Sequence, residues 1–192
     1  MIFSDQNIDN KPPLPGTVKF YQQHIIICIG HSDWPSNINH GDDFTSTLNQ
    51  AIINDEHIPN TRLTACDSPS IRSGTDILLF PHNIRLLSIS MLDIPNLILF
   101  LKNEIPNPFK FKEIEKMIFL VCGHQKRDDR CGKCGPMVLS SVQETISNKR
   151  MSDQVEVFKS SHLGGHRFAG ILVCYPSGNW YGRVNPSNVE KY

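Results

Sequence analysis

The sequence predicts an α/β fold made of two similar units, and three observations lead to this prediction. Two short apolar runs, at 24–30 and 116–123, have the length and composition of buried strands. Each run is followed by a segment with helical spacing, then by a further strand and by a pair of strands. A chain of 192 residues is long enough for one or two such domains.

The first unit is predicted from its opening strand to a closing helix. The segment 42–56 has apolar side chains at Phe44, Leu48 and Ile52, which is the spacing of one helix face, and an aspartate at its start can cap it. Further strands are expected at 62–66, 75–81 and 84–92, and a second helix at 93–103 with Pro95 in its first turn. The order is therefore βαβ, a β-hairpin and a helix.

The second unit repeats this order. It is expected to contain a strand at 116–123, a helix at 134–149, a strand at 154–161, a hairpin from 170–176 and 179–185, and the start of a helix at 186–192. This order in both halves predicts two thioredoxin-like units. The predicted boundaries are a flexible segment at 1–20, an N-terminal domain at 21–103, a linker at 104–112 and a C-terminal domain at 113–192.

Composition and charge argue against two classes of partner. Lysine plus arginine and aspartate plus glutamate are equal at 19 each, so no strong field favours nucleic acid. No apolar run approaches the roughly 20 residues that a membrane helix requires. The N-terminal residues lack an apolar signal sequence and carry Asp5 and Asp9, which an acidic-poor mitochondrial presequence would avoid. We therefore expect a cytoplasmic protein, with a mitochondrial location as the alternative.

Four side chains near the ends of two predicted strands are candidate metal ligands. Cys122 ends the first strand of the second unit, and Cys131 follows after eight residues. His162 and His166 follow the next strand and flank a glycine pair, which lets the backbone turn both imidazoles toward one point. Because the carboxyl ends of parallel strands meet at one edge of a sheet, we expect all four residues to converge there.

The spacing of these residues leaves the metal open. Zinc accepts two cysteines and two histidines, but its compact structural sites usually separate the cysteines by two to four residues. A [2Fe–2S] cluster tolerates wider spacing because its ligands hold two different irons. The segment Cys122-Gly123-His124 matches the first half of a Rieske motif, but the second half, C-x-x-H, is absent. His124 is therefore expected to support the ligands from behind or to face solvent.

Cys134 offers a different chemistry. Cys131 and Cys134 form a C-x-x-C at the start of a predicted helix, where the helix N-terminus would lower a thiol pKa. A thiol–disulfide oxidoreductase is therefore an alternative function, and Cys134 is a candidate redox thiol. A zinc-stabilised interaction module is a third hypothesis. No pair of carboxylates stands out as a glycosidase would need, so a redox protein is expected rather than a hydrolase.

Three segments together resemble one family. CGHQKRDDRCGKCGP, SHLGGHRFAG and NWYGRVNP, in this order, are similar to the sucrase/ferredoxin-like family of thioredoxin-like ferredoxins, as is the early stretch IICIGHSDWPSNI. The resemblance implies that the C-terminal domain is a thioredoxin-like ferredoxin domain. It also implies a [2Fe–2S] cluster held by Cys122, Cys131, His162 and His166, and hence electron transfer or redox sensing with an unidentified redox partner or reductase.

The implied ligand set has consequences for the reduction potential. Replacing two thiolates by neutral imidazoles changes the formal charge of the oxidised cluster from roughly minus two to roughly zero, so an electron should be easier to add. The second nitrogen of each imidazole can exchange a proton as the electron arrives. We therefore expect a pH-dependent potential that depends on His162 and His166.

Overall fold

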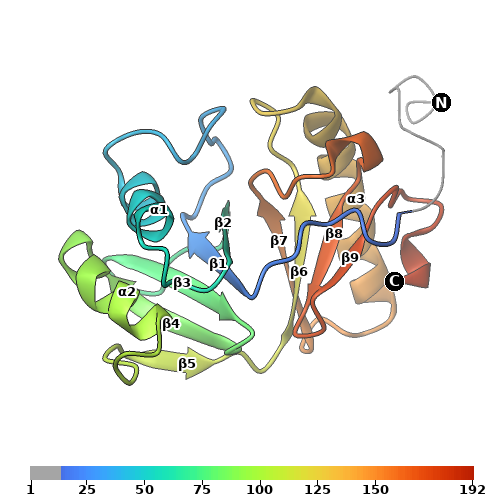
Figure 1. The fold of residues 1–192 in the computed structure, drawn as a ribbon. Coiled ribbons are helices and arrows are strands. Elements are labelled where there is room, and N and C mark those ends of the chain that lie inside the picture. The colour runs from blue at the N-terminus through green and yellow to red at the C-terminus, as the bar shows by residue number, and fades with distance from the viewer. Residues whose placement is uncertain (1–13) are drawn as a thin grey trace. The chain divides into compact units, whose positions relative to one another are not determined.

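The computed structural model describes residues 14–192, so most of the flexible segment predicted at 1–20 lies outside the described residues. The described chain divides into two compact units (Figure 1). The N-terminal unit consists of Phe20–His31 and Asn37–Ile114. The C-terminal unit consists of Glu115–Tyr192, residues 14–19 and the short segment Ser32–Ser36. Ser32–Ser36 thus packs with the C-terminal unit although its sequence neighbours on both sides belong to the other unit.

The N-terminal unit contains five strands and two helices. The strands are β1 (Gln23–Cys28), β2 (Thr61–Cys66), β3 (Thr75–Phe80), β4 (Ile84–Ile89) and β5 (Phe111–Glu113); the helices are α1 (Phe44–Asn54) and α2 (Ile94–Leu101). Their order in the sheet is β5-β4-β3-β1-β2, with β1 and β2 parallel and the other pairs antiparallel. The βαβ element followed by a hairpin and a helix is the order that the sequence predicts.

Alternating residues of β1 divide between the two faces of this sheet. Ile25 and Ile27 point to the face on which both helices pack, and they form one core with Leu48 of α1 and Leu97 of α2. Cys28, at the end of the strand, points to the opposite face because side chains alternate along a strand. The sheet therefore separates the helix-covered core from the residues that surround Cys28.

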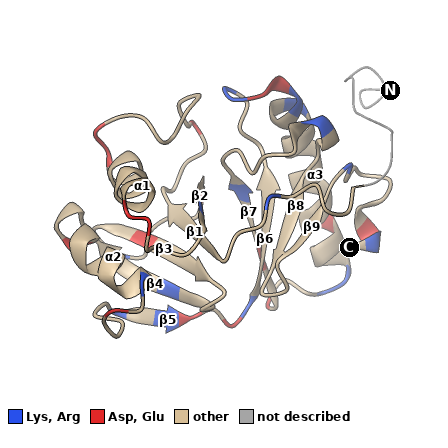
Figure 2. Ribbon diagram, in the orientation of Figure 1, with Lys and Arg blue, Asp and Glu red and all other residues tan. Residues whose placement is uncertain are grey.

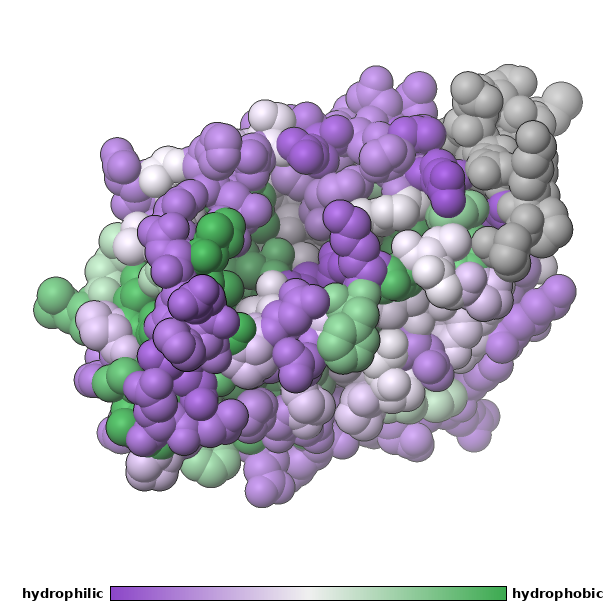
Figure 3. Space-filling view, in the orientation of Figure 1, coloured by the Kyte–Doolittle hydropathy of each residue, from purple (hydrophilic) through white to green (hydrophobic). Residues whose placement is uncertain are grey.

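The surface of the N-terminal unit exposes several large apolar side chains. Figure 3 shows apolar surface over this part of the molecule. The exposed side chains of this unit are Phe20, Ile53, Ile71, Met91, Leu92 and Phe111, with Leu92 exposed to 90%. In the described part of the C-terminal unit, the corresponding residues are Val18 and Tyr192. The N-terminal unit thus carries more of the exposed apolar surface.

The C-terminal unit has the same order of elements with four strands. They are β6 (Met117–Cys122), β7 (Val155–Ser160), β8 (Leu172–Tyr175) and β9 (Asn179–Tyr181), and the helix α3 (Asp129–Asn148) connects β6 to β7. The strands are arranged as β7-β6-β8-β9, with β6 and β7 parallel and β8 and β9 in an antiparallel hairpin. Val121 of β6 packs against Val138 and Val142 of α3 in the core of this unit.

The predicted α/β fold is confirmed, and four elements differ from their predicted bounds by three residues or more; one of them is β9, which ends at Tyr181 and not at 185. Helix α3 begins at Asp129, five residues earlier than predicted, because the Asp128 side chain caps it by accepting a hydrogen bond from the Arg130 N–H. Strand β4 ends at Ile89, and a 3-10 turn at Met91–Asp93 leads directly into α2. The predicted last helix at 186–192 is a single 3-10 turn at Val189–Lys191.

Strand β5 lies partly in the predicted linker. Phe111–Glu113 pairs with β4 through Leu86, Arg85 and Ile84, so this segment extends the sheet of the N-terminal unit. The two prolines of 104–109 favoured an irregular connection, but they do not extend to these residues. Within residues 14–192, no helix combines the length and apolar character that a bilayer crossing requires.

Candidate metal centre

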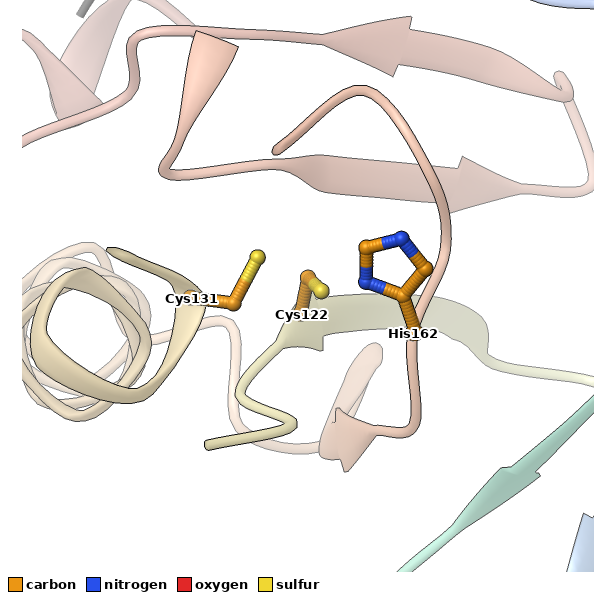
Figure 4. Close-up of side chains that lie close together, drawn as sticks. All are labelled: Cys122, Cys131 and His162. Carbon is orange, nitrogen blue, oxygen red and sulfur yellow. The ribbon is translucent and has the colours of Figure 1, made fainter. Parts of the chain in front are cut away.

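Three of the four predicted ligands come together at one end of the C-terminal unit (Figure 4). Cys122 is the last residue of β6, Cys131 lies in the first turn of α3, and His162 follows β7 by two residues. One ligand atom from each of these residues lies within 4.8 Å of the other two. The parallel pairing of β6 and β7 aligns Cys122 with Ser160, and this register brings His162 to the end of the strand that carries Cys122.

The start of α3 is held close to the backbone of the strand end. Gly135, in the second turn, packs so tightly that an added Cβ would lie 2.5 Å from the carbonyl oxygen of Cys122 and 2.7 Å from the Cα of Gly123. A glycine is required at this point because any side chain would push the helix away. The close approach of α3 is what brings the Cys131 thiol to Cys122.

Cys122 and Cys131 form a buried pair of thiols that share a proton. Both side chains are about 1% exposed. A hydrogen bond from the Cys131 thiol lowers the pKa of Cys122 well below its usual value, whereas the same contact raises the pKa of Cys131. Once the first of the two thiol protons is lost, the pair carries one negative charge, and the remaining proton is shared between the two sulfur atoms. A metal ion removes this restriction, because it takes the place of the remaining proton between the two sulfur atoms.

His162 presents a ring nitrogen that has no partner. Its Nδ1 is buried and makes no hydrogen bond with the described residues, which is costly for a polar atom unless something else binds it. A metal held by the adjacent thiolates would satisfy an imidazole nitrogen. The donor set of two sulfurs and one unsatisfied nitrogen therefore fits a metal group.

His124 holds the backbone of His162 in place. The N–H of His162 donates a hydrogen bond to Nδ1 of His124 at 3.2 Å, and Nε2 of His124 donates to the carbonyl oxygen of Pro35 at 2.8 Å. These two partners fix the neutral tautomer with its proton on Nε2, because the carbonyl can only accept. Burial lowers the pKa of His124, which favours the same neutral form.

The segment Ser32–Ser36 covers His124. Trp34 is buried, and its ring meets the His124 ring edge to face at 5.5 Å and 70°. The Lys159 ammonium group lies 3.3 Å from the Ser32 hydroxyl, and Lys126 forms a salt bridge with Asp33. Trp34 therefore packs against His124. The segment and His124 together form a support behind the ligands.

His166, the fourth predicted ligand, lies beside this group and is not among the three atoms within 4.8 Å. Its ring stacks on that of His162, with centroids 5.5 Å apart and planes 30° from parallel. Its side chain is 47% exposed, and its Nδ1 lies 3.7 Å from a carboxylate oxygen of Asp128. Gly165, which precedes it, has a φ of +65°, a conformation that glycine adopts without strain.

Cys134, the predicted redox thiol, points into the protein. It lies on α3 one turn after Cys131, its side chain is fully buried, and burial raises its pKa. A thiol becomes reactive when its pKa is lowered, and the pKa of Cys134 is shifted in the opposite direction. The structure therefore gives this C-x-x-C few of the properties of a thiol-exchange site.

The loop that precedes α3 carries charges of both signs (Figure 2). Asp128 accepts hydrogen bonds from the Arg130 guanidinium at 3.0 Å, and these contacts hold the pKa of its carboxyl below the usual value. Lys126 pairs with Asp33, as described above. Because Lys126 and Arg130 each have an acidic partner, we expect these two charges to have a small net effect on the electrostatic potential at the candidate site.

Sequence reasoning missed two residues that build the site and left the role of a third undecided. For His124, the sequence left open whether the residue supports the ligands or faces solvent. The structure shows that it is buried and accepts a hydrogen bond from the His162 N–H. Asp128 and Gly135 received no role, although they fix the start and the close approach of α3. A signal for Asp128 was present in the sequence, because an aspartate that precedes a segment with helical spacing is a common N-cap, and a second acidic residue, Asp129, follows in the first turn.

Known proteins similar to this chain fall into two groups. "Altered inheritance of mitochondria protein 32" of Meyerozyma guilliermondii is 34% identical over 46% of this chain and 39% of its own length. The protein of the same name from Debaryomyces hansenii is 40% identical over 42% of this chain and 31% of its own length. The matches thus span less than two fifths of these relatives. The solved thioredoxin-like [2Fe-2S] ferredoxin from Aquifex aeolicus is 19% identical over 40% of this chain and 81% of its own, with a TM-score of 0.35.

The family comparison covers the whole described chain. The family described as sucrase/ferredoxin-like matches residues 14–192, which include the described residues of both units and all the candidate metal ligands. The match agrees with the resemblance of the three segments on which the ligands lie. The chain belongs to the sucrase/ferredoxin-like family.

Proposed function

We propose that this protein is a redox protein that binds a [2Fe–2S] cluster through Cys122, Cys131, His162 and His166. The observation that carries the proposal is the meeting of two thiol sulfurs and one imidazole nitrogen within 4.8 Å, from three separate elements of the fold. Ligands drawn from a strand end, a helix start and a loop can reach more than one metal atom, as a two-iron cluster requires. Bound there, the cluster would take up and release single electrons.

Each residue of the centre has a separate task in this proposal. Cys122 and Cys131 bind as thiolates and keep the cluster away from solvent, because both are buried. His162 binds through a neutral ring nitrogen, and His124 fixes the backbone from which that ring extends. His166 is the exposed ligand, so it is where a proton or a redox partner would reach the cluster.

The fourth ligand requires a small rearrangement of one loop. His166 begins a 3-10 turn directly after two glycines with positive φ, Gly164 at +88° and Gly165 at +65°. These glycines allow the turn to rotate, and the stacked rings of His162 and His166 already lie side by side. Loading with the cluster is therefore expected to replace the ring stacking by ligation from both imidazoles.

The experiment that tests the proposal is anaerobic purification with iron and acid-labile sulfide analysis. A red-brown protein with iron and sulfide in equal amounts supports it, whereas a colourless protein that contains zinc without sulfide supports the zinc-stabilised module instead. His166→Ala is expected to lower the cluster content and to flatten the dependence of the potential on pH. His57→Ala, which alters an exposed histidine of the N-terminal unit, is the matched control and is expected to change neither.

The thiol–disulfide oxidoreductase is the competing function, and one variant distinguishes it. Cys134→Ser is expected to leave iron, sulfide and visible absorbance unchanged, because Cys134 is not among the clustered ligand atoms. If thiol exchange were the activity, this variant would abolish it. A protein that reduces a model disulfide only when Cys134 is present, and that carries no iron, would replace the cluster proposal.

The electron donor and the compartment are further parts of the proposal. We propose that electrons come from a separate reductase or a small reductant. The name of the relatives refers to the inheritance of mitochondria, which supports the mitochondrial alternative over the cytoplasmic one. Fractionation of cells that express the chain tests the location, and recovery in the cytosolic fraction alone would reject the mitochondrial alternative.

A further inference from the structure

A second group of chemically reactive side chains belongs to the N-terminal unit, whereas the candidate metal centre belongs to the C-terminal unit. The register of the strands places Cys28 of β1 directly beside Cys66 of parallel β2, and beside Asp76 of antiparallel β3. Paired residues of neighbouring strands point to the same face of a sheet. The two thiols and the carboxylate therefore form one row across three strand ends, on the face opposite α1 and α2.

The polar groups around this row are held rigidly. Asp76 is fully buried and accepts hydrogen bonds from the Arg85 guanidinium at 2.9 Å and from the backbone N–H groups of Ile71 and Ser88. The same guanidinium lies 3.4 Å from the hydroxyl of Ser68, two residues after Cys66. A cation is thus fixed next to the pair of thiols by partners that are themselves buried.

We propose that Cys28 and Cys66 form a reversible disulfide, which makes the N-terminal unit a two-electron redox site separate from the metal centre. Neighbouring strands lie about 4.8 Å apart, which falls within the range of roughly 4.4 to 6.8 Å between Cα atoms that disulfides span. The two cysteines are the last residues of their strands, where the backbone can shift more easily than in the middle of a sheet. Both are reduced in the structure and touch through a thiol hydrogen bond.

The two thiols are unequal, and this inequality assigns their roles. The hydrogen bond from Cys66 lowers the pKa of Cys28, with a smaller contribution from the charge of Arg85. The same hydrogen bond and burial raise the pKa of Cys66. Cys28 is therefore the thiol that reacts first, and Cys66 is the one that completes the disulfide.

A hydroperoxide small enough to reach a buried thiol is the oxidant class that fits. The Cys28 thiolate attacks one peroxide oxygen; an S–O bond forms, the O–O bond breaks, and the departing hydroxide takes a proton to become water. The sulfur of Cys66 then attacks the sulfur of Cys28, the S–O bond breaks, and the second hydroxide leaves as water with the proton of Cys66. In total, two thiols and hydrogen peroxide give one disulfide and two water molecules.

The bond would be easy to reduce again. Disulfides place their Cβ atoms about 3.8 Å apart, whereas aligned side chains on neighbouring strands start from nearly the strand spacing of about 4.8 Å. Closing the bond must draw the two strand ends together, and such strain makes a disulfide more readily reduced. This property is typical of a regulatory disulfide and not of a structural one.

Tryptic mapping of the intact protein tests the proposal directly. Cleavage after lysine and arginine places each of the six cysteines in a different peptide, with Cys28 in 20–62 and Cys66 in 63–72. The reduced protein is treated with hydrogen peroxide, blocked with an alkylating agent, digested and analysed by mass spectrometry without reductant. The expected product is 20–62 linked to 63–72, two hydrogen atoms lighter than the separate peptides, and a thiol reductant is expected to remove it.

Two variants sharpen the experiment. Cys66→Ser is expected to abolish the linked peptide and to leave Cys28 as a sulfenic acid that dimedone labels. Cys174→Ser removes a similarly buried cysteine of the C-terminal unit and is expected to keep the link. Recovery of Cys28 and Cys66 as two alkylated thiols, after peroxide has oxidised any other cysteine, would overturn the proposal. The two cysteines of the proposed metal centre lie in other peptides, 117–126 and 131–133, so their state is read separately from that of Cys28 and Cys66. Failure of one proposal therefore leaves the other intact.

Discussion

The two units end their first strand in similar ways, but different groups surround the cysteine at each end, and we propose a different chemistry for each. Strand β1 ends at Cys28 and continues with Gly30 and His31, and β6 ends at Cys122 and continues with Gly123 and His124. In the C-terminal unit the cysteine meets a second thiol from a helix and an imidazole from a loop. In the N-terminal unit it meets a second thiol from the neighbouring strand.

The difference arises from what faces each cysteine. Helix α3 begins soon after β6 and brings Cys131 in its first turn, whereas α1 begins only after the long segment 29–43 and offers Thr45 and Ser46 there. Cys122 is aligned with Ser160, whereas Cys28 is aligned with Cys66. A cysteine at a strand end is therefore not sufficient for a metal centre; the helix start and the following loop must each supply a donor.

Replacing the strand-end cysteine should have the largest effect, and in one unit only. We expect Cys122→Ser to lose nearly all iron and sulfide, because an un-ionised hydroxyl replaces a thiolate ligand. Cys28→Ser is the matched change at the corresponding position and should retain both. Iron and sulfide per protein chain, with circular dichroism to check folding, measure the difference. Equal losses of iron and sulfide from the two variants would show that these cysteines act through folding. The proposed difference in chemistry between the two units would then be rejected.

The histidines that follow the two cysteines should also differ. His124→Phe keeps a ring against Trp34 but leaves the Pro35 carbonyl and the His162 N–H without their partner. Because groups that orient ligands typically contribute about 10- to 100-fold to metal affinity, iron should be lost faster by about that factor during incubation with a chelator. His31→Phe, at the exposed counterpart, should behave as the wild type. Unchanged iron retention in His124→Phe would mean that the backbone of His162 is positioned without this hydrogen bond.

The close packing of α3 on β6 should be measurable as stability. Gly135→Ala gains helix propensity of about 1 kcal/mol, but its Cβ would collide with the backbone of Cys122 and Gly123. Overpacking of this kind costs about 1–3 kcal/mol, so we expect a net loss in the free energy of unfolding and a lower iron content. Gln143→Ala, on the exposed side of the same helix, is the control. A stabilised Gly135→Ala protein would show that the helix can move away from the strand without loss.

The order of elements could be read from the sequence because each one has a strong local pattern. The apolar runs of β1 and β6 and the spacing of α1 predicted the two units. The position of the candidate ligands after parallel strands predicted where three of the four meet. The start of α3 was misplaced because Gly132, Gly135 and Pro136 disfavour a helix. Capping by Asp128 and the packing of Gly135 outweigh that preference.

The parts of the site that escaped prediction depend on contacts between distant segments. Nothing local in HSDWP indicates that Trp34 and Pro35 would pack on His124, about ninety residues later in the sequence. The register that aligns Cys28 with Cys66 likewise depends on the pairing of two strands that are far apart in the sequence. Local sequence patterns indicate helices, strands and their ends. The residues that contact one another from different elements are determined by how those elements pack.

The smallest expected effect concerns the aspartates that cap the two helices, and it too should differ between the units. Asp43 caps α1 by accepting from the Ser46 N–H, and Asp128 caps α3 by accepting from the Arg130 N–H. Replacing either by alanine should cost about 1 kcal/mol of unfolding free energy. Only Asp128→Ala should also reduce iron retention, because α3 carries Cys131 and the Asp128 carboxylate lies 3.7 Å from His166.

The charge of Asp128 adds a pH dependence whose sign is fixed by its pKa. The hydrogen bonds from Arg130 lower the folded-state pKa below the ordinary value of 3.8, so the stabilisation is complete above that value and is lost as the pH falls through the lower folded one. Urea unfolding between pH 7 and pH 2 should show the wild type and Asp128→Asn converging as the pH falls, since asparagine keeps the cap without the charge. A constant difference across this range would mean that the pair with Arg130 contributes nothing to stability, because solvent screens it as it screens most exposed ion pairs.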